Sequence, residues 1–339
     1  MSAERLVLDD VDKVFGGRRR GDEPVHAVDH VTFALEPGAS LGLVGASGSG
    51  KSTIAKLVTG LERPTSGEVC FGDVRVDRLR RRGLRRLRSR VQMVFQDPYS
   101  ALNPLHTVSY TLSRPLANYL GMRERPARAR VRELLETVGL TPVGQFEGKL
   151  PHQLSGGQRQ RVVIAGALVL EPEIIVADEP VSSLDASVRG EILKLLLGLR
   201  DDFGIAMLVV THDLGLAWTI ADRVAVMYLG RIVEIGPAEE VLTRPLHPYT
   251  KALLEVVPEA GGLDRPYLSG EPPDPTRIPE GCRFHPRCPE VVSGAAAAAG
   301  VEDKCRGEDL GLLELRPGHF AACHLAAARR DDAVPAASS

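Results

Sequence analysis

The sequence predicts an α/β fold, in which buried strands alternate with helices. The first indication is the order within residues 41–58, where an apolar run, a glycine-rich loop and a helix-like apolar segment follow one another. The second is a pair of later apolar runs, residues 174–177 and 207–211, which are followed closely by charged or ionisable side chains. Such groups at the carboxyl ends of buried strands are typical of ligand-binding α/β sheets.

Residues 45–53, GASGSGKST, fit the phosphate-loop pattern G-x-x-x-x-G-K-[ST]. Glycines let backbone N–H groups point inward, and the helix start that follows adds a positive dipole end, so the loop can cradle a polyphosphate. Lys51 is then expected to reach the β- and γ-phosphates, and the Ser52 hydroxyl to ligate Mg²⁺. The alternative, a flexible Gly/Ser turn, does not require this order of strand, loop and helix. The residues predicted to bind in this loop are Gly45, Ser47, Gly48, Gly50, Lys51, Ser52 and Thr53.

The composition is typical of a soluble protein of about two domains. The chain has 339 residues, 43% of them apolar, and a net charge of −2, so no nucleic-acid partner is expected. The acidic N-terminus does not resemble a secretion signal, and no apolar run reaches the roughly 18 residues of a membrane span. Docking on a membrane protein stays open. Only Cys70 of the five cysteines precedes residue 282, which indicates a local site near the C-terminus.

Short β-type runs in residues 4–44 predict strands before the phosphate loop, interrupted by a turn-rich segment at 16–24. Phe15 precedes this turn, where its ring could stack on a nucleotide base or pack as a core residue. Residues 65–76 predict a turn and a hairpin strand, with Cys70 buried. The nine arginines of residues 75–90 favour a solvated helix face; an acidic partner, lipid headgroups and nucleic acid are the alternatives.

Two further segments predict a loop site and a helical insert. Gln96 follows an apolar strand that begins at residue 91, and its amide could bond both Mg²⁺ and a water, although it could equally be an ordinary loop residue. From residue 107 to about 150 the apolar spacing is helical, and Gly139 stands where a helix would end.

Residues 154–168 predict a second anion-binding helix start, because Ser155 is a good N-cap and Gly156 and Gly157 free the backbone. One triphosphate does not need two cradles. If this cradle faces a different copy of the domain, the second anion-binding site has a function.

Ionisable residues follow the two later apolar runs. Asp178 is placed to hold Mg²⁺ through its water shell, and Glu179 to orient or deprotonate an attacking water. Ser183 or Asp185 is expected to cap the next helix. His212 is expected to contact the γ-phosphate, although a lone histidine is often structural.

With these segments in this order, the chain resembles the ATP-binding subunit of ABC transporters. Its phosphate loop matches the Walker A motif, Gln96 the Q-loop, residues 154–158 (LSGGQ) the signature, residues 174–179 Walker B, residues 182–185 the D-loop, and His212 the switch histidine. The resemblance covers roughly residues 4–250 and implies a P-loop NTPase fold with an antiparallel β subdomain and a helical insert. It also implies ATP hydrolysis by a head-to-tail dimer.

The resemblance assigns roles to individual residues. Each ATP would lie between Lys51 of one subunit and the LSGGQ segment of the other, and Phe15 falls where the family often has a base-stacking tyrosine. The implied catalytic residues are Glu179, His212, Lys51 and Gln96; the implied Mg²⁺ ligands are Ser52, Gln96 and Asp178; and the further nucleotide contacts are Ser155, Gly156, Gly157, Gln158 and Asp185.

A narrower resemblance, to the oligopeptide and dipeptide importer branch, comes from residues 96–104, 247–258 and 281–289. Relatives in this branch also take up nickel or oligosaccharides. The resemblance implies two ATPase subunits, identical or related, at the cytoplasmic face of the membrane beneath two permeases, fed by an extracytoplasmic binding protein. A non-transport ABC ATPase of DNA repair or translation is the alternative, although neither a long coiled coil nor a second cassette is evident.

The expected domain division follows from both resemblances. The nucleotide-binding domain spans residues 1–255, with a helical subdomain at about 97–170. A small cysteine-containing extension spans residues 256–330, entered through a Pro-rich linker at 266–279, and residues 331–339 form a tail.

Cys282, Cys288, Cys305 and Cys323 are spaced C-x5-C-x16-C-x17-C. Four thiolates suit an iron–sulfur cluster or Zn²⁺, but the tight C-x2-C pairs of zinc ribbons are absent. The spacing resembles that of the importer branch, which can carry a [4Fe–4S] cluster there, so a cluster is favoured over zinc and over free thiols. It could staple a small domain or sense a metal. The histidines of this region, His285, His319 and His324, are spare ligand candidates, although a surface position is favoured for them.

Overall fold

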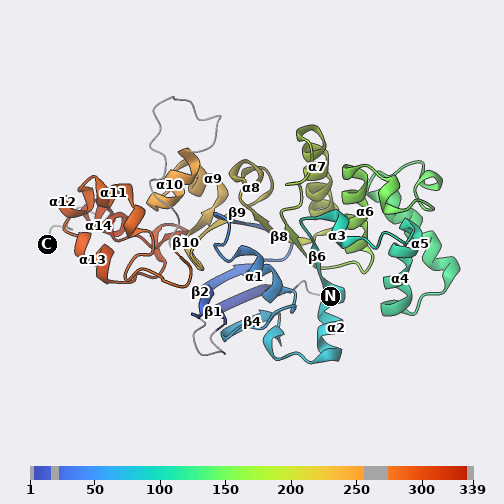
Figure 1. Cartoon of the computed structure of the whole chain (residues 1–339), viewed down its shortest axis with the longest axis horizontal. Coiled ribbons are helices and arrows are strands. Elements are labelled where there is room, and N and C mark those ends of the chain that lie inside the picture. Colours follow the sequence, from blue (N-terminus) through green and yellow to red (C-terminus); the bar gives the residue numbers. More distant parts are fainter. Residues whose placement is uncertain (1–3, 17–22, 256–273, 334–339) are drawn as a thin grey trace.

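The computed structural model describes residues 4–16, 23–255 and 274–333, and it contains two sheets with a helical region and a cysteine-bearing segment at opposite ends (Figure 1). Three parts of the sequence predictions lie outside the described residues: positions 17–22 of the turn-rich segment, positions 256–273 with most of the Pro-rich linker, and the end of the tail from 334. None of the described helices combines the length and the apolar character needed to cross a bilayer.

The central sheet has eight strands in the order β11-β12-β10-β9-β3-β8-β7-β6. Strands β6, β7, β8, β3 and β9 are parallel, so their carboxyl ends share one edge of the sheet. Strands β3, β7 and β8 are buried along their whole length, as their continuous apolar sequences predict. The strands are β3 Ser40–Val44, β6 Val91–Val94, β7 Ile174–Asp178, β8 Ala206–Thr211, β9 Arg223–Tyr228, β10 Arg231–Pro237, β11 Leu313–Arg316 and β12 His319–Ala321.

The smaller sheet is antiparallel, in the order β2-β1-β4-β5, which confirms both the strands expected before the phosphate loop and the later hairpin. Its apolar face shares a core with helix α1 and one face of the central sheet, through Leu6, Phe71, Leu57 and Leu208. The strands are β1 Leu6–Phe15, β2 Val25–Leu35, β4 Ser66–Phe71 and β5 Val74–Arg75, and α1 spans Lys51–Val58.

The arginine-rich run forms the short helix η1 Val76–Arg78 and helix α2 Arg81–Arg90, in which Leu87 is the one buried side chain. Arg90 forms ion pairs with Glu173, at 2.5 Å, and with Glu4, at 3.1 Å. The remaining arginines of α2 are exposed or partly exposed, as a solvated helix face requires.

The helical region packs against the other face of the central sheet around Leu112, Leu116, Val131 and Leu135. Its apolar residues recur at helical spacing, as predicted, and α5 ends just before Gly139, which has a left-handed φ of 72°. The elements are α3 Pro98–Ala101, α4 Val108–Leu120, α5 Glu124–Thr137, η2 Val143–Gln145, η3 Pro151–Gln153 and α6 Gly156–Leu168. Helices α7 Ala186–Phe203 and α8 Leu214–Ile220 complete the crossovers between strands β7, β8 and β9.

The C-terminal segment is joined to the rest of the molecule, because β12 pairs antiparallel with β10 and continues the central sheet. Phe284, Cys288, Cys305 and Cys323 belong to one apolar core with Tyr249. A separate small cysteine domain is therefore not confirmed. The elements of this part are α9 Ala238–Thr243, α10 Pro248–Glu255, η5 His285–Arg287, α11 Pro289–Val292, α12 Ala295–Ala298, α13 Glu302–Gly307 and α14 His324–Ala333.

Two of the histidines expected at the surface are buried. The His319 side chain is 0% exposed and its Nε2 lies 2.7 Å from the carboxylate of Glu234, which is also 0% exposed. His324 is 9% exposed, with Nε2 at 2.9 Å from the Glu308 carbonyl oxygen. The expectation was wrong because a histidine with one hydrogen-bond partner can be buried, and neither partner is near it in sequence.

Candidate functional site

The phosphate loop connects the buried strand β3 to helix α1, and its glycines are required by close contacts. A Cβ atom on Gly45 would lie 2.3 Å from the Met227 carbonyl oxygen, and one on Gly50 would lie 2.1 Å from the Ala27 carbonyl oxygen. Gly50 caps α1 with a left-handed φ of 105°. The loop therefore has the strand, turn and helix start that the sequence pattern predicts.

Lys51 is buried within its own loop. Its ammonium group donates hydrogen bonds to the carbonyl oxygens of Gly45 and Ala46, both at 2.8 Å. Burial lowers the pKa of Lys51, while the nearby carboxylates of Glu179 and Asp178 oppose that shift. An ammonium held among carbonyl oxygens is ready to transfer its hydrogen bonds to phosphate oxygens.

Ser52 and Asp178 lie together beside the loop. The Ser52 hydroxyl donates to Asp178 Oδ1 at 3.2 Å, although 126 residues separate them in sequence. Asp178 ends β7 and is 9% exposed; burial raises the pKa of its carboxyl, and the Ser52 hydrogen bond opposes this. A hydroxyl and a carboxylate are oxygen ligands of the kind that Mg²⁺ prefers.

Glu179 is the centre of the remaining predicted catalytic residues. Its Oε1 lies 2.7 Å from His212 Nδ1, and its Oε2 accepts from the Gln96 amide at 3.4 Å. Gln96, Glu179 and His212 follow strands β6, β7 and β8, so the sheet brings together three residues far apart in sequence. The predicted convergence at the carboxyl edge of the sheet thus matches the observed geometry.

The second predicted cradle lies elsewhere. Ser155 caps α6 by accepting from the Gln158 N–H at 3.3 Å, and the Gln158 side chain accepts from the Ser155 N–H at 3.1 Å. Figure 1 shows α6 beside α4 and α5, away from α1. Among the described residues, no hydrogen bond joins the 155–158 segment to the phosphate loop of the same chain.

The D-loop lies against the start of α6. A Cβ atom on Gly156 would be 3.5 Å from the Leu184 side chain, and one on Gly157 would be 2.6 Å from that of Val188. Asp185 occupies the N-cap position of α7, as predicted, but its side chain makes no capping hydrogen bond. Its exposed carboxylate is free to contact another molecule.

Phe15 ends β1 and is 38% exposed, with the ammonium of Lys13 at 4.6 Å from the ring centroid. An exposed ring can stack on a base, as the role predicted for Phe15 requires.

Tyr249 on α10 contacts the phosphate loop, and the sequence did not predict this contact. Its hydroxyl accepts from the N–H of Ala46, inside the phosphate loop, at 3.0 Å. A buried aromatic residue in an apolar helix is typical of core packing, so no sequence signal distinguished it.

The four C-terminal cysteines lie around one small cavity of about 20 Å³, which they share with His247, His285 and His324. All are free thiols, and burial raises the pKa of each, to about 12 for Cys282 and about 11 for Cys323. The predicted grouping is thus observed. No three of the four cysteine sulfur atoms lie within 4.8 Å of one another. Among the described residues, the one group of three His, Cys, Asp or Glu side chains with ligand atoms within this distance is Asp12, Asp29 and His30.

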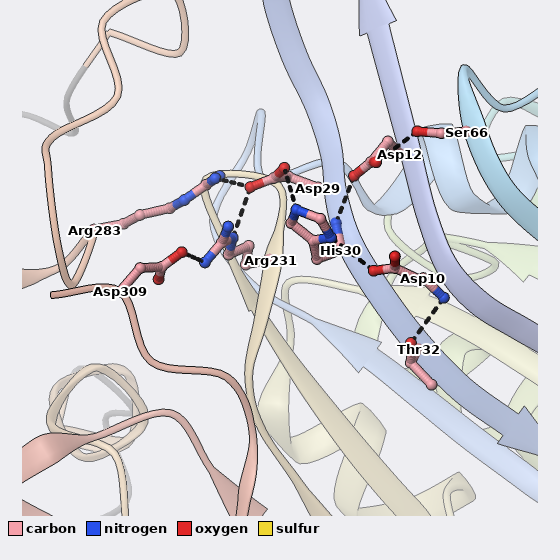
Figure 2. Close-up of polar contacts among 9 residues, drawn as sticks. All are labelled: Asp10, Asp12, Asp29, His30, Thr32, Ser66, Arg231, Arg283 and Asp309. Carbon is pink, nitrogen blue, oxygen red and sulfur yellow. Dashed lines mark hydrogen bonds and ion pairs between the residues drawn. The ribbon is translucent and has the colours of Figure 1, made fainter.

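The Asp12, Asp29 and His30 group has other partners (Figure 2). Asp12 accepts from the His30 N–H at 2.7 Å and from Ser66 at 2.6 Å, while Asp29 accepts from Arg231 at 2.7 Å. These hydrogen bonds and ion pairs account for the cluster without a metal.

Two family models match the chain. The model described as ABC transporter matches residues 28–182, and the model described as oligopeptide/dipeptide transporter, C-terminal region, matches residues 233–294.

Several curated proteins are similar over most of their length. The probable peptide ABC transporter ATP-binding protein y4tS of Sinorhizobium fredii is 44% identical, over 89% of this chain and 83% of that protein. The oligopeptide transport ATP-binding protein AppF of Bacillus subtilis is 42% identical, over 94% and 97%. The dipeptide transport ATP-binding protein DppF of Haemophilus influenzae is 40% identical, over 89% of each.

Solved structures share the fold. The dimeric post-hydrolysis state of the ATP-binding cassette MJ0796 bound to ADP and Pi matches with a TM-score of 0.62 and 33% identity, covering 69% of this chain and 98% of that chain. The protein cbiO1 from Clostridium perfringens, part of the ABC transporter complex cbiONQ, matches with a TM-score of 0.63 and 31% identity, covering 70% and 90%. These similarities agree with the phosphate loop and with the residues that converge around Glu179. The chain therefore belongs to the ABC transporter ATP-binding proteins, in the oligopeptide/dipeptide branch.

Proposed function

We propose that this ABC ATPase binds and hydrolyses ATP to energise the import of dipeptides or oligopeptides. The observation that supports hydrolysis best is the position of Glu179, whose carboxylate lies between Gln96 and His212 at the edge that also carries the phosphate loop. The names of the relatives, which concern peptide transport, support the cargo class. Nickel, oligosaccharides and a role in DNA repair or translation are less favoured.

Each residue of the site has a proposed role. Glu179 orients and deprotonates the attacking water, and Lys51 and His212 stabilise charge on the γ-phosphate. Ser52, Asp178 and Gln96 would hold Mg²⁺, which neutralises phosphate charge when bound. The Ser52–Asp178 hydrogen bond fits this role because it brings two oxygen ligands together without a metal. Phe15 would stack on the base.

We further infer a head-to-tail dimer. Residues 155–158 at the start of α6 are capped and are exposed or partly exposed, but they lie away from the phosphate loop of their own chain. They would therefore meet the nucleotide of a second ATPase subunit. Ser155, Gly156, Gly157, Gln158 and Asp185 would complete that site. The dimeric state of the related cassette MJ0796 supports a dimer. The second subunit is either a copy of this chain or a related ATPase.

The remaining partners follow from the proposed transport function. The dimer would sit peripherally at the cytoplasmic face of the membrane, beneath two integral permeases that receive cargo from an extracytoplasmic binding protein. Co-purification with the permeases after mild detergent extraction is the expected result. Stable association with ribosomes or DNA instead would contradict the transport function.

The proposed role of Glu179 is tested by Glu179→Gln. This variant should bind ATP, lose about a hundredfold or more in kcat, and accumulate as an ATP-dependent closed dimer on size-exclusion chromatography, because a general base typically contributes about 10²–10⁴-fold. Glu191→Gln, at an exposed position of α7, is the matched control. Wild-type turnover in Glu179→Gln would exclude the role.

The cysteine-lined cavity is proposed to hold a [4Fe–4S] cluster, with Cys282, Cys288, Cys305 and Cys323 as ligands. Four free thiols around one cavity fit a four-thiolate site. A tetrahedral zinc ion with bonds of about 2.3 Å would place its sulfur atoms about 3.8 Å apart, closer than any three are here. The cluster would cross-link and stabilise the surrounding segment.

Anaerobically purified protein is expected to show the broad visible absorption of iron and sulfide. The variant Cys288→Ser is expected to lose this absorption. The control is Ser109→Ala, at a half-buried position of α4 that is far from the cavity in sequence. Stoichiometric zinc with no visible absorption would exclude the cluster and support the zinc alternative.

A further inference from the structure

The phosphate loop is held in place by a residue from the C-terminal half of the protein. The N–H of Ala46 donates to the Tyr249 hydroxyl at 3.0 Å, while the Ala46 carbonyl accepts from Lys51 at 2.8 Å. Tyr249 is 1% exposed. Ala46 is therefore fixed on one side by the lysine of the loop and on the other by a buried tyrosine.

A second support reaches the loop through the turn between β9 and β10. The N–H of Gly230 donates to the Ser49 carbonyl oxygen at 2.9 Å. The preceding residue, Leu229, has a left-handed φ of 43°, which is unfavourable for a residue with a Cβ atom. The Arg283 guanidinium donates to the Leu229 carbonyl, so it holds this strained turn in place.

Arg283 is itself fixed by a second partner. It forms an ion pair with Asp29 on β2, which Arg231 also contacts (Figure 2). The Arg283 side chain is only 8% exposed, so both of its partners lie in a water-poor environment where charged hydrogen bonds are strong.

Arg283 and Phe284 stabilise the two supports of the phosphate loop: Arg283 bonds the turn that carries Gly230, and Phe284 packs on Tyr249. Phe284, which follows Arg283, is 1% exposed, and its ring centroid lies 5.3 Å from those of Tyr249 and Tyr228. Arg283 and Phe284 stand between Cys282 and Cys288, which line the small cavity. A displacement of these cysteines would move Phe284 against Tyr249 and Arg283 against Leu229.

We propose that Tyr249, Phe284 and Arg283 are positioning residues of the phosphate loop, and that they couple the cysteine-lined cavity to nucleotide affinity. The inference rests on the proposed function only in taking this loop as the nucleotide site. A loop held from two sides loses less conformational freedom on binding, so loosening either support weakens binding. Because coupling is reciprocal, bound nucleotide also restrains the cysteine segment.

The first experiment compares Tyr249→Phe with Tyr228→Phe. Both remove one hydroxyl from the same aromatic cluster, but of these two tyrosines only Tyr249 has a described hydrogen bond to the phosphate loop. Calorimetric titration with MgADP should give a Kd that rises about threefold to tenfold in Tyr249→Phe, the effect of one hydrogen bond, and less than twofold in Tyr228→Phe. Nucleotide-free Tm values should be similar in the two. Equal Kd values in the two variants would overturn the role of Tyr249.

Lys51→Ala separates this inference from the proposed function. If wild type and Lys51→Ala bind MgADP equally, the nucleotide site is misassigned. If only Lys51→Ala fails to bind while Tyr249→Phe matches wild type, the site stands and the positioning role is wrong.

The second experiment is a double-mutant cycle between Tyr249→Phe and Cys288→Ser. Coupling predicts that Cys288→Ser raises the Kd for MgADP and that the double variant is no weaker than the weaker single variant. Multiplied effects, or a wild-type Kd in Cys288→Ser, would overturn the coupling. If circular dichroism shows that Cys288→Ser is unfolded, Arg283→Lys replaces it, because it keeps every cysteine and removes one of the two charged hydrogen bonds.

Discussion

Glu179 has an unusual backbone for a residue with a long side chain. Its φ of 47° lies in the left-handed region, at a cost of about 1–3 kcal/mol, and its N–H is held by the Val210 carbonyl at 2.8 Å. This conformation turns the chain sharply at the end of β7. The carboxylate is thereby directed toward His212 and Gln96 rather than along the strand.

The Glu234 side chain is also held by a few specific contacts, and these contacts stabilise the fold. Its carboxylate is fully buried and accepts hydrogen bonds from the N–H groups of Leu246, at 2.7 Å, and His247, at 2.9 Å, in addition to the His319 imidazole at 2.7 Å. One side chain of β10 thus joins β12 to the chain that precedes α10.

Glu234→Ala should lower the free energy of unfolding by about 3–5 kcal/mol, because it leaves three buried donors without an acceptor. Chemical denaturation checks this. Glu239→Ala, at an exposed position of α9, is the control and should change stability by less than about 1 kcal/mol. Equal losses in the two variants would contradict the network.

At the scale of elements, the phosphate loop depends on its fit against two neighbouring strands. Gly50 contacts the backbone of β2 at Ala27, and Gly45 contacts that of β9 at Met227. The loop is therefore shaped as much by the antiparallel sheet and the central sheet as by its own sequence.

Gly50→Ala should abolish nucleotide binding, because the added methyl would meet the Ala27 carbonyl at 2.1 Å. Gly48→Ala is the matched comparison: it has a left-handed φ of 78° but nothing within 4 Å of the added atom. It should retain measurable binding, at a cost of about 1 kcal/mol from backbone strain. Fluorescent-nucleotide titration distinguishes the two, and similar binding by both would argue against the steric explanation.

Elements with local signals were predictable from the sequence. Examples are the phosphate loop, the helices around Val131 and the charged strand ends. Each combines a motif with its own flanking pattern, so its geometry follows from residues that are close in sequence. Strand β12 gave no such signal, because it has three residues and pairs with a strand about 85 positions earlier. Tyr249 and the buried His319 were missed because their partners are distant in sequence.

At the scale of the whole molecule, the C-terminal segment covers part of the ATPase core. It pairs with β10 and packs Phe284 on Tyr249 and Tyr228. The sequence predicts a small C-terminal domain, and the observed packing of this segment on the ATPase core does not confirm a separate one.

A chain that ends at Glu255 should therefore aggregate and melt at a lower temperature, because the edge of β10 and the aromatic cluster become exposed. Light scattering and thermal unfolding measure this. A chain that ends at Ala333 keeps all the contacts of the described residues and is the control. A monodisperse 255-residue chain with the Tm of the control would contradict the prediction.

The pairing of β12 with β10 also bears on how the protein is made. A ribosome-bound chain that has emerged only as far as Glu255 contains every residue of the phosphate loop, yet it lacks β12 and Phe284. Because synthesis proceeds from the N-terminus, at about 5–20 residues per second, Tyr249 and Gly230 are present several seconds before Arg283 and Phe284, the residues that hold them in place. Tight nucleotide binding should thus be a late event in biogenesis, acquired only when the cysteine-bearing segment has been translated.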